Sequence, residues 1–239
     1  MRRLFPASRK LVPAGVMACA AIVTSLAACS GGGGGSGDPL SGMDPNQITM
    51  KAFTDLKNAT SVHVTGPENN SGTTYDLTAT LGSTNCQANF AQPGKGSYSV
   101  LKVGGITYFS ATKNWWQNHN ASGQDLNTLT GKFVKVGPNS TTLNALGALC
   151  HPSQLAGPFT GNVTGMINKG WTTVNGQKAL HIGDSGDSAG IYVSDSSTPE
   201  VLRLDGSSSL DLSFTNYNAP LNLTAPPPSQ VLDGKKMGF

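Results

Sequence analysis

Cysteine supplies the clearest chemical signal in this chain of 239 residues, which contains four of them. Cys29 directly follows Leu26-Ala27-Ala28, and an aliphatic residue with two small ones is the pattern that precedes a thiol destined for diacylation. Four basic residues within positions 2–10 and an uncharged, mostly apolar run at 11–26 complete an export signal. The sequence therefore predicts that residues 1–28 are removed and that a diacylglyceryl group on Cys29 anchors the chain to a membrane.

Two alternatives to lipidation remain open at this stage. The segment could be a plain signal peptide in which Cys29 is incidental, or a membrane anchor that is retained. A spanning helix needs about 20 apolar residues, and the run here is shorter. The stretch after Cys29 is Ser30, five glycines, Ser36 and Gly37, which predicts a flexible tether.

The predicted organisation has three parts. Residues 1–28 form a lipoprotein signal peptide, residues 29–44 the lipidated cysteine and its tether, and residues 45–234 a single folded domain. A domain of roughly 190 residues is long enough to bury a sizeable core.

The net charge of +3 comes mainly from the signal segment. Four of the 16 basic residues lie within positions 1–28, which contain none of the 13 acidic residues, so the rest of the chain carries about −1. This charge gives no reason to expect a nucleic-acid partner. With the lipid anchor, it predicts a protein on the extracytoplasmic face of a bacterial plasma membrane.

Two further cysteines, Cys86 and Cys150, remain in the predicted domain once Cys19 is removed with the signal and Cys29 is acylated. In an exported domain two such thiols most simply form one disulfide. A metal site or a Cys150-His151 pair is the alternative. The four histidines show no ligand spacing, so we predict neither a metal nor another cofactor.

Catalytic motifs are not found in the sequence: it has no Gly-x-Ser-x-Gly, no His-Glu-x-x-His, no phosphate loop and no dinucleotide fingerprint. Asp184, Asp187 and Asp195 lie in a region rich in Gly and Ser, where Asp is favoured for its local hydrogen bonds. A calcium or acid/base site there is the alternative to solvated turns. These observations favour binding over catalysis, and we expect the protein not to be an enzyme.

The predicted fold class is α+β. Asp44-Pro45 opens an amphipathic helix through Asn58, and a second helix is expected from Leu143 to Cys150. Gly104-Gly105 and Asn175-Gly176 predict tight hairpins. The proline run at 225–228 is expected to end the sheet. Alternating residues predict strands at 61–65, 75–81, 86–90, 98–103, 106–109, 171–174, 177–182, 190–194, 201–204 and 210–214, with a short extended piece at 133–136.

Several segments occur in an order that resembles a known family. They are the cysteine motif at 26–29, the opening helix that runs into Ser61-Val62-His63, and the segments 103–109, 132–136, 175–180, 191–194, 199–203 and 214–226. Together they resemble the actinobacterial cell-envelope lipoproteins of the LppX/LprG type, whose fold is similar to that of the LolA lipoprotein carrier. The resemblance implies a strongly curved antiparallel sheet, a half-barrel, with helices packed on its concave face. It also implies an apolar cavity for the acyl chains of a lipid or glycolipid.

Strand alternation indicates which residues would line such a cavity. Three functions are compatible with the sequence. The first is a lipid carrier. The second is a non-carrier lipoprotein with a filled core that binds an envelope protein or senses the wall, and the third is an exported hydrolase. If the opposite strand faces turn inward, the lining residues would instead include Leu101, Val103 and Phe109. The residues that we expect to line the cavity of a lipid carrier are Phe53, Leu56, Val100, Ile106, Tyr108, Leu180, Ile191 and Val193.

Overall fold

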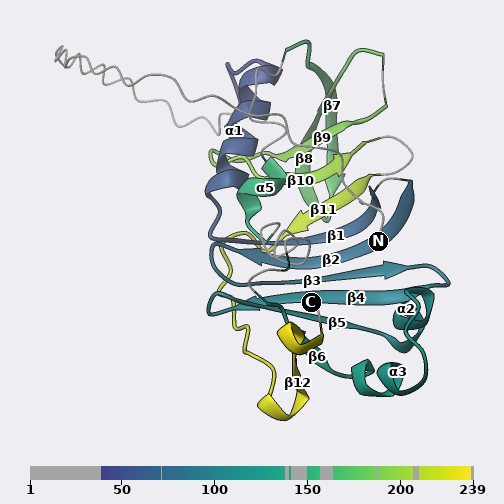
Figure 1. Ribbon diagram of the computed structural model, residues 1–239. Helices are drawn as coiled ribbons and strands as arrows, with labels where there is room; N and C mark the ends of the chain where they lie inside the picture. The colour runs from purple at the N-terminus through teal and green to yellow at the C-terminus, as the bar shows by residue number, and fades with distance from the viewer. Residues whose placement is uncertain are drawn as a thin grey trace, which may run out of the picture. The chain divides into compact units, whose positions relative to one another are not determined.

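Twelve strands form one curved, unclosed sheet in the computed structural model, which describes residues 39–70, 72–137, 140, 150–156, 164–186, 188–206 and 210–237. The strand order is β12-β6-β5-β4-β3-β2-β1-β11-β10-β9-β8-β7 (Figure 1). The strands are β1 Ser61–Asn70, β2 Thr73–Gly82, β3 Cys86–Gln92, β4 Gly96–Val103, β5 Ile106–Ala111, β6 Phe133–Lys135, β7 Ile167–Val174, β8 Gln177–Gly183, β9 Gly190–Ser194, β10 Val201–Asp205, β11 Asp211–Thr215 and β12 Val231–Asp233.

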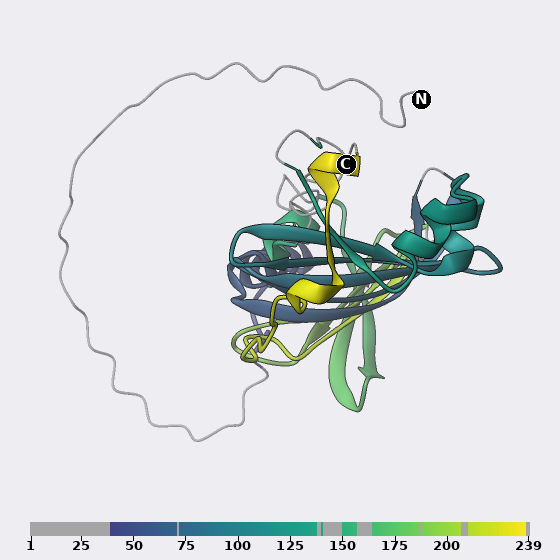
Figure 2. The same ribbon diagram turned by 60° about the horizontal axis from the view of Figure 1, so that its bottom comes forward.

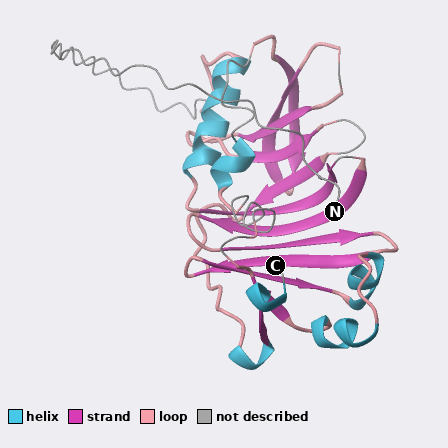
Figure 3. Cartoon of the chain, viewed as in Figure 1, coloured by secondary structure: helices cyan, strands magenta, loops and turns pink. Residues whose placement is uncertain are grey.

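Helices occupy less of the described chain than strands do (Figure 3). The α-helices are α1 Pro45–Asn58, α2 Lys113–Asn118, α3 Gly123–Leu129 and α5 Pro152–Ala156, and the 3₁₀ helices are η3 Pro228–Gln230 and η4 Gly234–Met237. The α+β class with a curved sheet is therefore confirmed.

Helix α1 begins at a reciprocal cap. The Asp44 side chain accepts hydrogen bonds from the backbone N–H groups of Asn46 and Gln47, and the Gln47 side chain accepts one from the Asp44 backbone. These bonds satisfy N–H groups that the first turn of a helix leaves unpaired. Phe53 and Leu56 are fully buried on the inner face of the helix, as the apolar spacing predicted.

Both glycine-containing hairpins are confirmed. Gly104 and Gly105 join β4 to β5 with φ values of 58° and 77°, and Asn175 and Gly176 join β7 to β8 with φ values of 51° and 79°. Two consecutive residues with positive φ form the turn whose twist matches that of paired strands, and Gly and Asn adopt it most readily.

One face of the sheet carries the core. Val64, Ala79, Ala88, Val100 and Phe109 are successive cross-strand partners from β1 to β5, and all five are buried. At the β1 end this row joins the apolar cluster that includes residues of α1 and α5, and at the β5 end it joins the cluster that includes residues of α2 and α3. The four α-helices in the described part of the chain therefore cover the same face of the sheet.

Two expectations about the C-terminal edge of the sheet were wrong. Strand β12 pairs with β6 in parallel, so the sheet is mixed and not wholly antiparallel. The proline run at 225–228 also does not end the sheet, because β12 follows it. In Figure 2, turned so that the bottom of Figure 1 comes forward, the yellow C-terminal strand lies in front of the teal strands. The helix expected from Leu143 to Cys150 lies almost wholly outside the described residues.

Candidate binding groove

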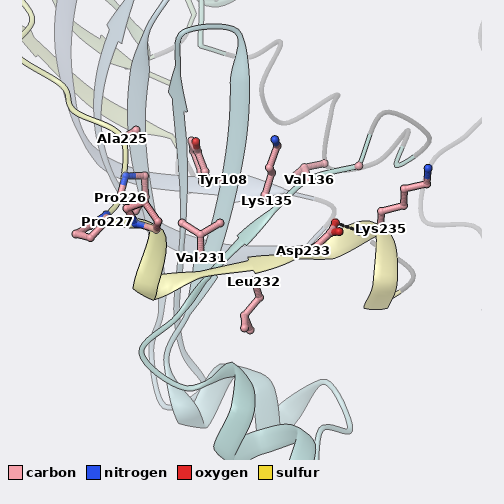
Figure 4. Close-up of a pocket in the computed structure, with 12 residues that line it drawn as sticks. Tyr108, Lys135, Val136, Ala225, Pro226, Pro227, Val231, Leu232, Asp233 and Lys235 are labelled. Carbon is pink, nitrogen blue, oxygen red and sulfur yellow. Dashed lines mark hydrogen bonds between the residues drawn. The ribbon is translucent and has the colours of Figure 1, made fainter.

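A groove of about 880 Å³ lies beside the C-terminal edge of the sheet (Figure 4). Its volume falls within the range of pockets that hold small organic ligands. Residues from β5, β6, β12 and the proline run form its walls. They are Tyr108, Lys135, Val136, Gly137, Ala225, Pro226, Pro227, Pro228, Val231, Leu232, Asp233 and Lys235. We call this feature the C-terminal groove.

Strand register determines which side chains face the C-terminal groove. Tyr108 of β5 is the cross-strand partner of Lys135 in β6, and Lys135 is the partner of Asp233 in β12. Because side chains alternate along a strand, Val231 and Asp233 share one face and Leu232 takes the other. Figure 4 shows Leu232 pointing away from the side on which Tyr108, Lys135 and Val231 lie. The groove therefore lies on the face opposite the one that α2 and α3 cover.

The proline run forms a wall because it cannot join the sheet. Pro226, Pro227 and Pro228 have no backbone N–H, so they cannot donate ladder hydrogen bonds, and residues 221–227 have no regular secondary structure. The Lys132 ammonium donates a hydrogen bond of 3.0 Å to the Ser229 carbonyl, which connects the chain just before β6 to η3. This contact holds the end of the proline run close to the strand that it faces.

The rim of the C-terminal groove carries more positive than negative charge. Lys135 and Lys235 are exposed, and neither forms an ion pair with another residue in the part of the chain that is described. The Asp233 carboxylate accepts a 3.1 Å hydrogen bond from the backbone N–H of Lys235. A largely apolar interior beneath two ammonium groups suits an amphiphile with an anionic head.

The sequence-predicted cavity residues do not gather in one place. Five of them pack together in the core cluster that includes α1, and Phe53, Leu56 and Val193 have no accessible surface. Side chains without accessible surface border no space that a water molecule could enter. In this structure the region beneath α1 is therefore filled by protein. The five residues are Phe53, Leu56, Leu180, Ile191 and Val193.

The β4–β5 register separates the remaining candidates. Val100 pairs with Phe109 on the helix-covered face, whereas Leu101 pairs with Tyr108 on the opposite face. Val103 and Ile106 are partners on that second face as well, where both are half-buried. Each of the two sets proposed from alternation thus mixes the two faces. Of all these residues, only Tyr108 lines the C-terminal groove.

Lys135, Val231 and Lys235 are groove residues that sequence reasoning missed. A short extended piece at 133–136 was expected, and β6 lies there. Its parallel partner β12 begins at Val231, far along the chain, and a three-residue strand has no periodicity by which to recognise it. The one available signal was the proline run, which marks a segment that lies against a sheet without joining it.

The predicted disulfide is confirmed. Cys86 at the start of β3 is bonded to Cys150, with Cα atoms 5.3 Å apart and a sequence separation of 64 residues. Both cysteines belong to the core cluster that also contains Ala156 of α5. The bond therefore holds the segment that leads into α5 against the helix-covered face.

The acidic turn region forms no metal site among the residues that are described. No group of three or more metal-binding side chains occurs there. Asp195 instead forms a 2.6 Å ion pair with Lys178. Asp184 is exposed, and Asp187 lies outside the described residues. No described helix is both long and apolar enough to span a bilayer. Cys29 and the predicted tether up to residue 38 also lie outside the described residues, whereas residues 39–44 are described, and Leu40 among them is buried.

Two solved structures that are similar to this chain are distant from it in sequence. No protein family and no curated protein matches the sequence. One similar solved structure is an uncharacterized conserved protein from Thermus thermophilus, with 13% identity, 78% of this chain and 96% of that chain covered, and a TM-score of 0.33. Another is a DUF1329 family protein from Desulfovibrio piger, with 9% identity, 76% and 96% covered, and a TM-score of 0.26. Scores this low support no argument, so the function of this chain must be inferred from its own residues.

Proposed function

We propose that the protein is a membrane-anchored, exported lipoprotein that binds an acylated lipid in the C-terminal groove. The observation that carries this proposal is the combination of an apolar interior, which Tyr108, Pro226 and Val231 line in part, with the two ammonium groups of Lys135 and Lys235 at its rim. An acyl chain would lie against the apolar residues. The lysines would attract an anionic head group. The sequence motif at Cys29 would keep the protein beside the membrane from which the lipid comes.

The free energy gained by burying an acyl chain and the cost of association together favour reversible binding. Each buried methylene contributes about 0.8 kcal/mol, so about ten methylenes contribute about 8 kcal/mol. Association costs on the order of 4–15 kcal/mol, which offsets much of that gain. An open groove that holds part of one acyl chain would therefore exchange its lipid with a membrane. Such exchange suits a carrier, the function that the resemblance to the LppX/LprG type implies. We also propose, on that resemblance, that the helix-covered face is the concave one.

A separate observation supports a second function. Phe53, Leu56 and Val193, which were expected to line a cavity, have no accessible surface. A filled core favours a lipoprotein that binds an envelope protein and carries no lipid. The two proposals differ in what co-purifies with the protein.

Native mass spectrometry of the full-length protein, extracted in mild detergent, tests the lipid proposal. We expect extra mass that organic extraction identifies as acylated lipid, beyond the acyl groups on Cys29. Val231→Trp, which places a larger side chain in the groove, should reduce that mass. Lys135→Glu with Lys235→Glu should reduce binding of anionic lipids, and the exposed Lys113→Glu on α2 is the matched control. A protein free of lipid after incubation with anionic vesicles would overturn the carrier proposal.

A further inference from the structure

A further pocket lies where β10, β11 and β1 run side by side (Figure 1). Its volume of about 520 Å³ is within the range of pockets that hold small organic ligands. It opens on the face of the sheet opposite the helices, because Thr65 and Ser213 are cross-strand partners that alternate with the core residues Val64 and Phe214. We call it the Arg203 pocket. Its polar lining consists of Thr65, Thr173, Asn175, Arg203, Asp211 and Ser213.

The ladder between β1 and β11 is interrupted beside the Arg203 pocket. Regular pairing of the two strands ends at Thr65 and Ser213. The next residue, Gly66, has a φ of 139°, and a Cβ atom there would overlap the Asp211 carbonyl oxygen. Pro67 follows and has no N–H with which to continue the ladder. Both residues line the pocket, so the interruption lies inside the sheet and next to the polar side chains.

The end of the β7–β8 hairpin forms the other wall. Val174, the last residue of β7, belongs to one buried cluster with Ala179 of β8 and Leu202 of β10. Because β8 and β9 lie between β7 and β10 in the sheet, this packing requires the end of the hairpin to bend toward β10. Thr173 and Asn175, on either side of Val174, therefore line the same pocket as residues of β10 and β11.

Arg203 and Asp211 present hydrogen-bond donors and acceptors in a fixed arrangement. The guanidinium Nε and Nη2 atoms donate to the two Asp211 carboxylate oxygens, over 2.7 and 2.8 Å. The Nη1 atom, which carries two further N–H groups, donates to no residue in the described part of the chain. Each Asp211 oxygen can accept a second hydrogen bond. A ligand beside this pair could therefore both accept from Arg203 and donate to Asp211.

Three hydroxyl groups and one amide surround the pair. The side chains of Thr65, Thr173, Ser213 and Asn175 form no hydrogen bond with any residue that the structure describes. Hydroxyl and amide groups both donate and accept hydrogen bonds. Pro67 adds an exposed apolar surface beside them. Such a lining suits a ligand that carries several hydroxyl groups on a ring with an apolar face.

The charges around the Arg203 pocket favour a neutral ligand. Asp205 and Asp211 both pair with Arg203, so two carboxylates surround one guanidinium. An anion would meet this negative excess, and a cation would compete with Arg203 for a carboxylate that two short hydrogen bonds already hold. A peptide that adds a strand needs a free sheet edge, whereas β10, β11 and β1 are interior strands. The hydroxyl groups of a neutral sugar meet none of these obstacles.

We propose that the Arg203 pocket binds a neutral sugar ring, whose hydroxyl groups pair with Arg203, Asp211 and the hydroxyls of Thr65 and Ser213. The inference goes beyond the proposed function and does not depend on it, because it needs neither a lipid in the C-terminal groove nor acylation of Cys29. On an exported protein, a pocket of this kind would contact saccharides outside the membrane.

Saturation-transfer difference NMR of the full-length protein tests the proposal, in dodecylphosphocholine because this detergent carries no sugar. The probes are maltotriose, mannotriose and triacetylchitotriose, and we expect transfer to at least one of them. A double variant with Thr65→Val and Ser213→Ala loses two hydroxyls and should raise the Kd about tenfold. The matched control is Ser99→Ala with Ser110→Ala, a cross-strand pair on the same face of the sheet and outside the pocket.

Three results would overturn the inference. The first is no transfer to any of the three oligosaccharides at millimolar concentration. The second is a Kd that the Thr65 and Ser213 substitutions leave unchanged, or that the control pair raises equally, because the sugar would then lie elsewhere. The third is tighter binding of glucose 6-phosphate than of glucose, which would indicate an anion site. Urea unfolding checks that each variant is folded, and Thr173→Val, at an exposed position in the same pocket, replaces the double variant if that one unfolds.

Discussion

The imidazole ring of His181 lies flat against the phenol ring of Tyr192, with ring centroids 4.3 Å apart and an angle of 6° between the planes. The Arg203 guanidinium lies 5.2 Å from the same phenol ring and forms two hydrogen bonds, of 2.7 and 2.8 Å, with the Asp211 carboxylate. This row crosses β8, β9, β10 and β11 on the face of the sheet opposite the helices. A change in the charge of His181 therefore changes its electrostatic interaction with the charged side chains of this row.

Acidification should destabilise the fold through His181. Burial lowers its pKa from 6.5, and the charges of Lys169 and Arg203 lower it further, while Asp205 opposes them. A lowered pKa means that the unfolded chain takes up the proton more readily, so stability is present above about pH 6.5 and is lost as the pH falls. Urea unfolding from neutral pH to about pH 5 should show this loss. His181→Gln should weaken the pH dependence, and a loss of stability that is equally steep in this variant would contradict the assignment.

Glu68 should reduce stability at neutral pH. Its side chain is half-buried, and burial raises its pKa from 4.5. The folded state therefore favours the protonated acid, so this group contributes stability below about pH 4.5 that is lost as the pH rises. We expect Glu68→Gln to raise the free energy of unfolding at neutral pH and to have little effect near pH 3. Thermal unfolding at both pH values checks this, with the exposed Asp125→Asn as control. An equal effect at both would contradict the assignment.

Loss of the disulfide should be costly because the loop that it closes is long. The separation of 64 residues between Cys86 and Cys150 corresponds to about 4 kcal/mol in the chain-entropy estimate. We expect a double variant with Cys86→Ala and Cys150→Ala to lose on the order of 4 kcal/mol in urea unfolding. The wild type under reducing conditions should behave similarly. A loss below about 1 kcal/mol would mean that the unfolded chain is already restrained without the bond.

Truncation of Phe53 measures how well the region beneath α1 is packed. The side chain is fully buried, so Phe53→Ala should cost about 3–5 kcal/mol. Met50, one turn earlier and 46% exposed, provides the control, because Met50→Ala should change stability by less than about 0.5 kcal/mol. The free energies come from urea unfolding of the two variants. A small cost at Phe53 would indicate that the region tolerates a cavity.

Local signals predicted much of the fold. The α1 cap at Asp44-Pro45 and the turns at Gly104-Gly105 and Asn175-Gly176 depend on neighbouring residues alone, and each lies where it was expected. The disulfide followed from counting cysteines. Such features need no knowledge of the distant chain.

The binding groove could not be predicted in the same way. Placing Val100 and Tyr108 on one face was an avoidable error, because the two-residue turn at Gly104-Gly105 pairs Val103 with Ile106. The same register pairs Val100 with Phe109 and leaves Tyr108 on the other face. The parallel pairing of Val231 with Phe133 brings together residues with no common local pattern. Long-range pairing thus explains why Tyr108 was proposed and its groove neighbours were not.

The pairing of β12 with β6 also sets an order of events in folding. The β2–β3 and β4–β5 hairpins connect residues close in sequence, so their loops close at low entropic cost and they can form early. Strand β12 lies near the end of the chain and must find β6 across a separation that includes β7 to β11. The wall of the groove is therefore among the last parts to assemble. A chain that lacks its final residues would fold most of its sheet and still lack one wall of the groove.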